Sequence, residues 1–147
     1  QSGSWGFTWP ATLLRVDGET FEENFDVLGK EAFGPTGLLI ELRDLDQAVR
    51  IAKRIEGQLT VSLYSNPDDA DAFKTLAAPL RHRCGRLLQN KMPTGVAVVP
   101  SMVHGGPFPA TGHPGFTAVG MPTSVSRFAA RQCFDGIEEE FLPEILR

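Results

Sequence analysis

The stretch from Lys30 to Pro35 carries the residue types and the spacing best suited to binding a nucleotide. Glu31 and Phe33 lie two residues apart, so in an extended backbone both side chains point the same way. A carboxylate can accept hydrogen bonds from both hydroxyls of a ribose, and an aromatic ring beside it can pack on a flat heterocycle. By pattern alone, a core Phe33 next to a solvated Glu31 is the more common arrangement. The nucleotide site is therefore a hypothesis at this point.

Other reactive groups are few. His82 and Cys84 are two residues apart, so on a strand they share a face and form a conceivable nucleophile pair. Cys84 begins an apolar run, however, and buried cysteines are mostly inert. His104 and His113 are too scattered to join His82 in a metal site. The sequence has no Gly-x-Gly-x-x-Gly after a strand, no Walker loop, no His-Glu-x-x-His and no Gly-x-Ser-x-Gly.

The strands and helices that must position these residues alternate along the middle of the chain. Short apolar runs predict strands over Ala11–Val16, Thr36–Leu42, Gln58–Tyr64 and Cys84–Asn90. An apolar stripe predicts a helix that begins at Asp44 and ends before Gly57 as its C′ residue, and a second begins at Asn66-Pro67 and ends near Pro79. This alternation favours an α/β fold, a parallel open sheet with flanking helices and right-handed crossovers.

Three regions are less regular. Phe21–Leu28 is only weakly amphipathic, so an irregular conformation is open there. Lys91–Gly120 is rich in Gly, Pro, Thr and His, and a loop of this length is usually functional or unfolded. Its scattered apolar residues argue against full disorder. Ser124–Phe134 returns to a helix-like pattern.

Composition excludes several partners. The net charge of -4 without a basic stripe argues against nucleic acid and anionic membranes. The longest apolar stretches, such as Gly37–Ile40, are too short to span a bilayer. Gln1–Trp9 lacks the features of a signal peptide, and Cys84 and Cys133 form no disulfide framework, so we expect a cytoplasmic protein. Because the chain begins with Gln1, we also expect a piece of a longer polypeptide.

Several motifs together resemble the aldehyde dehydrogenase family. Glu31-Ala32-Phe33-Gly34-Pro35 resembles its Glu-Glu-x-Phe-Gly-Pro motif, with Lys30 in place of the first Glu. Gly57–Ser65 and Gly85–Asn90 resemble its Gly-Leu-x-x-x-Val-Tyr/Trp-Thr and Gly-x-Val-x-x-Asn segments, and the order agrees over Ala11–Phe134. Pro93–Val96 and Met102–Thr111 resemble the branch that oxidises α-ketoglutaric semialdehyde, because most other branches have Pro-Phe-Gly-Gly in place of Gly106–Pro109.

The resemblance implies the C-terminal part of the catalytic domain over residues 1–134, and a tail over 135–147 available for subunit contact in a homo-oligomer. It implies oxidation of an aldehyde to a carboxylate with NAD or NADP. Glu31 then binds the nicotinamide ribose, Phe33 packs near the nicotinamide, and Phe108 forms a wall of the aldehyde pocket. Val103 and His104 are expected near that pocket.

The family's nucleophile motif, Gly-Gln-x-Cys, and its base motif, Glu-Leu-Gly-Gly, are both absent from this chain, as is the dinucleotide-binding domain. The chain therefore has no expected catalytic residue and no expected metal ligand. We expect it to be inactive without the upstream part of the same enzyme. The alternatives are a non-catalytic oligomerisation or interaction module and a small Cys–His enzyme that uses Cys84 and His82.

Overall fold

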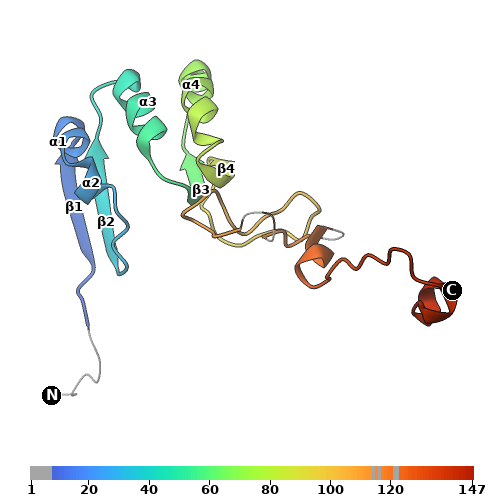
Figure 1. Cartoon of the computed structure of the whole chain (residues 1–147). Coiled ribbons are helices and arrows are strands. Elements are labelled where there is room, and N and C mark those ends of the chain that lie inside the picture. Colours follow the sequence, from blue (N-terminus) through green and yellow to red (C-terminus); the bar gives the residue numbers. More distant parts are fainter. Residues whose placement is uncertain (1–7, 114, 116, 121–122) are drawn as a thin grey trace.

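The computed structural model describes residues 8–113, 115, 117–120 and 123–147 (Figure 1). Residues 1–7, which hold most of the segment tested for a signal peptide, lie outside the described residues. The strands are β1 (Thr12–Asp17), β2 (Thr36–Glu41), β3 (Gln58–Leu63) and β4 (Cys84–Gln89). The helices are α1 (Gly18–Glu23), α2 (Phe25–Leu28), α3 (Leu45–Arg54) and α4 (Ala70–Leu80). The predicted alternation of strands and helices is confirmed, as is the α/β class.

The strands pair in parallel, but they form two small sheets. β1 pairs with β2 from Thr12 opposite Thr36 to Asp17 opposite Glu41, and β3 pairs with β4. Within the described residues β2 does not pair with β3, so the expected single open sheet is not formed (Figure 1). Alternating strands and helices predict parallel pairing but not which strands are neighbours, because a crossover can pass over an intervening position.

Helix α3 begins where the sequence predicts and ends differently. The Asp44 carboxylate accepts a hydrogen bond of 2.8 Å from the Gln47 amide, which confirms the predicted cap. The helix ends at Arg54, and Ile55 turns to an extended ψ of 143°. Gly57 is therefore not the C′ residue. The chain leaves the helix through an ordinary L-residue conformation, so this exit needs no left-handed glycine.

Helix α4 follows its predicted start and end. Pro67 opens a 3₁₀ turn over Pro67–Asp69, and the Asn66 amide donates a 2.8 Å hydrogen bond to the Asp69 carboxylate. The helix ends at Leu80, one residue after Pro79. A proline has no amide hydrogen and crowds the preceding turn, so it is tolerated here only because the helix is ending.

Two short helices occupy the segment for which an irregular conformation was open. Asp17 caps α1 by accepting 2.8 Å hydrogen bonds from the backbone amide and the hydroxyl of Thr20. Phe21 is only 3% exposed and meets the Phe25 ring edge-on at 5.4 Å. Weak periodicity concealed these helices because a cap and one buried ring, rather than a long apolar stripe, stabilise them.

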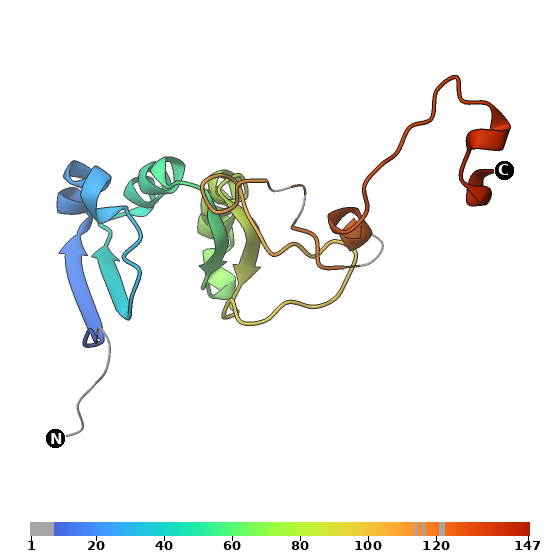
Figure 2. The ribbon, with the colours of Figure 1, turned by 60° about the horizontal axis from the view of Figure 1, so that its bottom comes forward.

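The C-terminal region corrects another prediction. Ser124–Phe134 was expected to be helix-like, but only a 3₁₀ turn over Thr123–Arg127 forms there. From there the chain runs without regular structure to a turn at Glu139–Phe141, away from the strands (Figures 1 and 2). Phe128 is 84% exposed, so this apolar stripe is not buried against the other described residues. A short helix without tertiary packing is marginal in water.

The chain leaves an unusual amount of surface uncovered. Its accessible surface is 11592 Å² for 16.0 kDa, whereas a compact monomer of that mass exposes about 7,400 Å². The core is small: the buried apolar residues among those described are Phe21, Ile51, Ala52, Leu80, Cys84 and Ala118. Among the described residues, no helix has the length and apolar character needed to cross a bilayer.

A carboxylate joins the first helices to α3. Glu22 accepts 2.9 Å hydrogen bonds from Arg50 Nε and from Gln47 Nε2, and Gln47 is only 3% exposed. The Gln47 oxygen in turn accepts from the Arg43 amide at 2.8 Å. The Arg54 guanidinium lies 4.2 Å from the centre of the Phe25 ring. These contacts fix the position of α1 and α2, and hence of the segment that follows them.

Glu22 should make the stability of this part of the fold sensitive to acid. Hydrogen bonds from Arg50 and then Gln47 lower the pKa of Glu22 from 4.5 to about 2. Because the folded-state pKa is depressed, the stabilisation is complete above pH 4.5 and is lost as the pH falls toward 2. A Glu22→Gln variant should be less stable than wild type at pH 7, and the difference should shrink through this window. Urea unfolding at several pH values measures it. A difference that does not change with pH would contradict the assignment.

Candidate functional site

An open cavity of about 620 Å³ brings together three segments that are far apart in the sequence. The first is the connection between α2 and β2, the second is the connection from α3 into β3, and the third belongs to the long loop after β4. The lining residues are Gly29, Lys30, Glu31, Phe33, Glu56, Gly57, Gln58, Leu59, Thr60, Pro109 and Ala110. The cavity therefore combines charged, polar and apolar groups from different parts of the fold.

Glu31 and Phe33 both line this cavity. Phe33 is 94% exposed, so it is not part of the core formed by the described residues. Burying such a ring stabilises a protein by about 1.5–3 kcal/mol. The described residues do not bury Phe33, so this stabilisation is absent. An exposed ring beside a carboxylate in a concave site is a feature of binding surfaces.

The segment that carries these two side chains is anchored at both ends. On one side, the Gly29 amide donates to the Phe25 carbonyl at 2.8 Å, which completes α2. On the other, the Thr36 amide donates to Gly34 at 2.8 Å, and the Thr12 amide of β1 donates to Pro35 at 2.9 Å. The backbone from Lys30 to Phe33 is thus held between a helix and a sheet edge.

The long loop after β4 supplies another part of the cavity lining. Pro109 and Ala110 line the cavity, and Phe108 precedes them with 79% of its surface exposed. The Ala110 amide donates to the Pro107 carbonyl at 2.9 Å, and the Thr111 hydroxyl donates to the Gly106 carbonyl at 2.7 Å. The loop is ordered by these bonds. Phe108 itself does not line the cavity of Glu31 and Phe33, so its role at the aldehyde remains a prediction.

Val103 and His104 face two other cavities. Val103 lines one of about 300 Å³ with Cys84, whereas His104 lines one of about 120 Å³ with Arg86. An antiparallel bridge between Val103 and Ala118 makes the backbone extended there, so successive side chains point to opposite sides. Neither residue lines the cavity of Glu31 and Phe33. Their role at the aldehyde remains a prediction.

Cys84 lacks the surroundings of a nucleophile. It is 8% exposed, and its thiol donates to the Leu80 carbonyl at 3.3 Å. Burial raises the pKa of Cys84, which keeps it protonated at neutral pH. His82 lies in the turn after α4, where its Nε2 accepts a hydrogen bond of 3.1 Å from Arg81. The geometry therefore gives no support to a Cys84–His82 enzyme.

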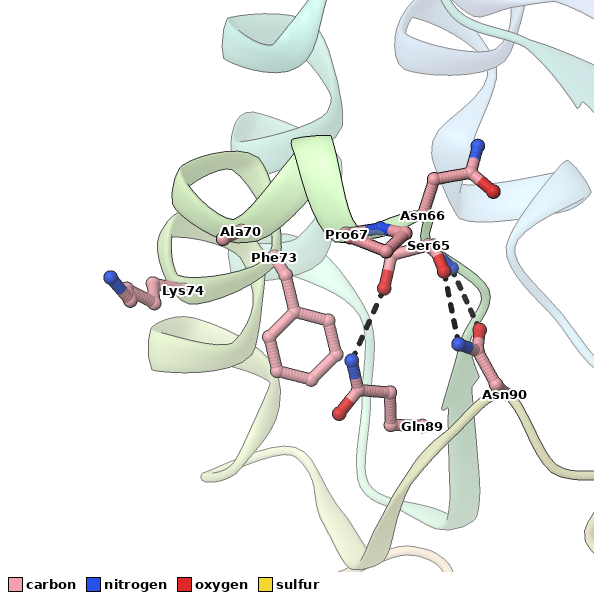
Figure 3. Close-up of a pocket in the computed structure, with 8 residues that line it drawn as sticks. All are labelled: Ser65, Asn66, Pro67, Ala70, Phe73, Lys74, Gln89 and Asn90. Carbon is pink, nitrogen blue, oxygen red and sulfur yellow. Dashed lines mark hydrogen bonds between the residues drawn. The ribbon is translucent and has the colours of Figure 1, made fainter.

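A further hollow of about 390 Å³ lies where β3 and β4 end, with the Phe73 ring on one side (Figure 3). Asn90 closes this end: its amide nitrogen donates to the Ser65 carbonyl at 2.9 Å, and its oxygen accepts from the Ser65 amide at 2.8 Å. Asn90 has a φ of 50°, which asparagine tolerates better than most residues. The asparagine that ends the Gly85–Asn90 motif thus clamps two neighbouring strands together.

Lys30 and Glu56 also line the candidate cavity, and sequence reasoning did not place Glu56 there. No local signal marks Glu56, because it enters the cavity only through the path of the chain between α3 and β3. Lys30 stands where the resembled family has its first Glu, and it adds a positive charge beside Glu31. The described residues contain no group of His, Cys, Asp or Glu that could hold a metal ion.

Comparison with curated proteins identifies relatives with one activity in their names. The chain is 44% identical over 117 residues to alpha-ketoglutaric semialdehyde dehydrogenase 2 of Azospirillum brasilense, which covers 80% of this chain and 22% of that protein. It is 36% identical over 135 residues to alpha-ketoglutaric semialdehyde dehydrogenase of Acinetobacter baylyi, covering 92% and 26%. The chain belongs to the aldehyde dehydrogenases. No protein-family model matches it.

This aldehyde dehydrogenase chain spans about a quarter of the length of the curated relatives it matches. The predicted resemblance to the α-ketoglutaric semialdehyde branch is confirmed, since both relatives carry that name.

Proposed function

We propose that this chain is the C-terminal part of an NAD(P)-dependent dehydrogenase that oxidises α-ketoglutaric semialdehyde to the carboxylate. The single observation that carries the proposal is the 44% identity to a dehydrogenase named for that substrate. The full-length enzyme is, in this proposal, the longer polypeptide that contains the chain. The uncovered apolar surface supports it, because the missing part would bury side chains such as Leu13, which is 76% exposed.

Within this enzyme, Glu31 and Phe33 form one wall of the cofactor site. Their residue types fit a nucleotide, since Glu31 supplies a hydrogen-bond acceptor and Phe33 an uncovered ring within one cavity. When bound, NAD(P) would accept the hydride from the substrate. Glu31 would orient the ribose, and Phe33 would exclude water from one side of the nicotinamide.

Phe108 forms part of the aldehyde wall in the same proposal. What supports this is that Phe108 directly precedes Pro109, which lines the cavity together with Glu31 and Phe33. The tail over residues 135–147 is proposed to contact another subunit. Ile145 in that tail is 90% exposed, and a homo-oligomer would cover it.

The chain alone should not oxidise the aldehyde. Neither cysteine lies in a Gly-Gln-x-Cys motif, and Cys84 is buried with a raised pKa. Incubating the purified chain with α-ketoglutaric semialdehyde and either NAD or NADP should produce no NAD(P)H above buffer, whereas the full-length enzyme should produce it. Absorbance at the nicotinamide band measures both. Turnover by the chain alone that disappears in a Cys84→Ser variant would instead identify the small Cys–His enzyme.

A further inference from the structure

The loop after β4 meets the sheet of β3 and β4 through its backbone rather than through side chains. A Cβ added to Gly85, near the start of β4, would overlap the Gly105 carbonyl oxygen and lie 3.1 Å from Gly106 Cα. A Cβ on Gly106 would overlap the carbonyl oxygen of Gln58, the first residue of β3. Gly105 and Gly106 are buried in this contact.

A third close approach adjoins the candidate cavity itself. A Cβ added to Gly57 would overlap the Pro107 carbonyl oxygen and lie 2.5 Å from that of Phe108. Gly57 lines the cavity of Glu31, and Pro107 precedes Phe108. The strand starts and the loop thus touch at three neighbouring points, and each point contains a glycine.

These glycines are required by space rather than by backbone conformation. Positive φ values among the described glycines occur at Gly95 and Gly136, not at the three contact positions. An L-residue could therefore adopt the local backbone at Gly57, Gly85 and Gly106, but its Cβ would meet a peptide group. Backbone atoms cannot rotate away as a flexible side chain can, so the loop itself would have to move.

We propose that Gly57, Gly85 and Gly106 are positioning residues that set the distance between the cofactor wall and the aldehyde wall, and thereby select the aldehyde by its length. The inference rests on the proposed function, because it requires that the cavity holds cofactor and aldehyde together. Phe108 lies in the turn that the hydrogen bonds from Ala110 to Pro107 and from Thr111 to Gly106 close. We therefore expect that a displacement of the loop where it touches the sheet also displaces the Phe108 ring.

The test compares Gly85→Ala with Gly112→Ala in the full-length enzyme. Gly112 lies in the same loop, is exposed, and would carry a Cβ with nothing within 4 Å. An added methyl at Gly85 should displace the loop by on the order of 1 Å, which can cost about 100-fold in an aligned active site. We expect kcat/KM for α-ketoglutaric semialdehyde to fall roughly 10- to 100-fold, and Gly112→Ala to match wild type.

Two further measurements distinguish a displaced loop from a general loss of folded structure in the variant. The ratio of kcat/KM for α-ketoglutaric semialdehyde to that for acetaldehyde should change in Gly85→Ala, because moving one wall affects a long aldehyde more than a short one. The dissociation constant for NADH, measured by fluorescence, should stay within about 2-fold. Gly106→Ala, which opens the same contact from the loop side, should change the ratio in the same direction.

Each outcome has a distinct meaning. A wild-type enzyme that oxidises no aldehyde overturns the proposed function, and the positioning role falls with it. An active wild type whose Gly85→Ala and Gly106→Ala variants keep the wild-type aldehyde ratio overturns the positioning role alone. If Gly57→Ala, Gly85→Ala and Gly106→Ala all fail to fold while Gly112→Ala folds, the glycines are required for stability and the proposal is also overturned.

Discussion

Replacing Glu31 with glutamine in the full-length enzyme is expected to weaken cofactor binding about 10- to 100-fold, the effect of losing a charge-assisted hydrogen bond of about 1.5–3 kcal/mol. Glutamine keeps the shape of the side chain and its carbonyl oxygen but removes the charge. Both ribose hydroxyls would therefore lose a strong acceptor. The dissociation constant of NADH and the KM for NAD and NADP measure the change, whereas the KM for the aldehyde should move much less.

Glu23→Gln is the matched control, because Glu23 is exposed on α1 and does not line the cavity. It makes the same change of charge and should leave cofactor binding at the wild-type value. Glu56→Gln tests which carboxylate accepts the hydrogen bonds of the ribose, since Glu56 lines the same cavity from the α3–β3 connection. A larger loss from Glu56→Gln than from Glu31→Gln would assign the ribose to the α3–β3 connection and contradict our proposal.

Truncating Phe21 to alanine is expected to cost about 3–5 kcal/mol of stability, the usual loss for a buried phenylalanine. Phe21 is 3% exposed and supports the Phe25 ring, on which the Arg54 guanidinium lies. Its loss should loosen α1 and α2 from α3 and release the segment that carries Glu31. Hydrogen exchange of the β1 and β2 amides in the full-length enzyme measures the local free energy of opening.

Phe128→Ala provides the comparison, because it removes the same side chain where it is 84% exposed. Its effect should stay within about 0.5 kcal/mol in the β1–β2 region. Equal protection of these amides in Phe21→Ala and wild type would show that α1 does not stabilise this sheet. In that case the position of Glu31 would depend on contacts outside the described residues.

Strong local signals predicted most of the regular elements. Asp44 and Asn66-Pro67 mark helix starts because a cap or a proline acts within one turn, whatever surrounds it. The alternation in Gln58–Leu63 marks a strand for the same reason. Packing-dependent elements were left open or mispredicted. The sequence left Phe21–Leu28 open, where α1 and α2 form around buried Phe21, and it wrongly predicted a helix over Ser124–Phe134, where Phe128 is 84% exposed.

The sequence by itself determined the α/β class and the family resemblance, and it predicted that Glu31 and Phe33 lie on one side of an extended segment, because each depends on residues close together in the chain. Only the tertiary structure decided that β2 and β3 stay unpaired within the described residues, that Gly57 serves a close approach rather than a helix end, and that Pro109 lines the same cavity as Glu31. Those outcomes depend on contacts between segments more than twenty residues apart, which no local pattern encodes.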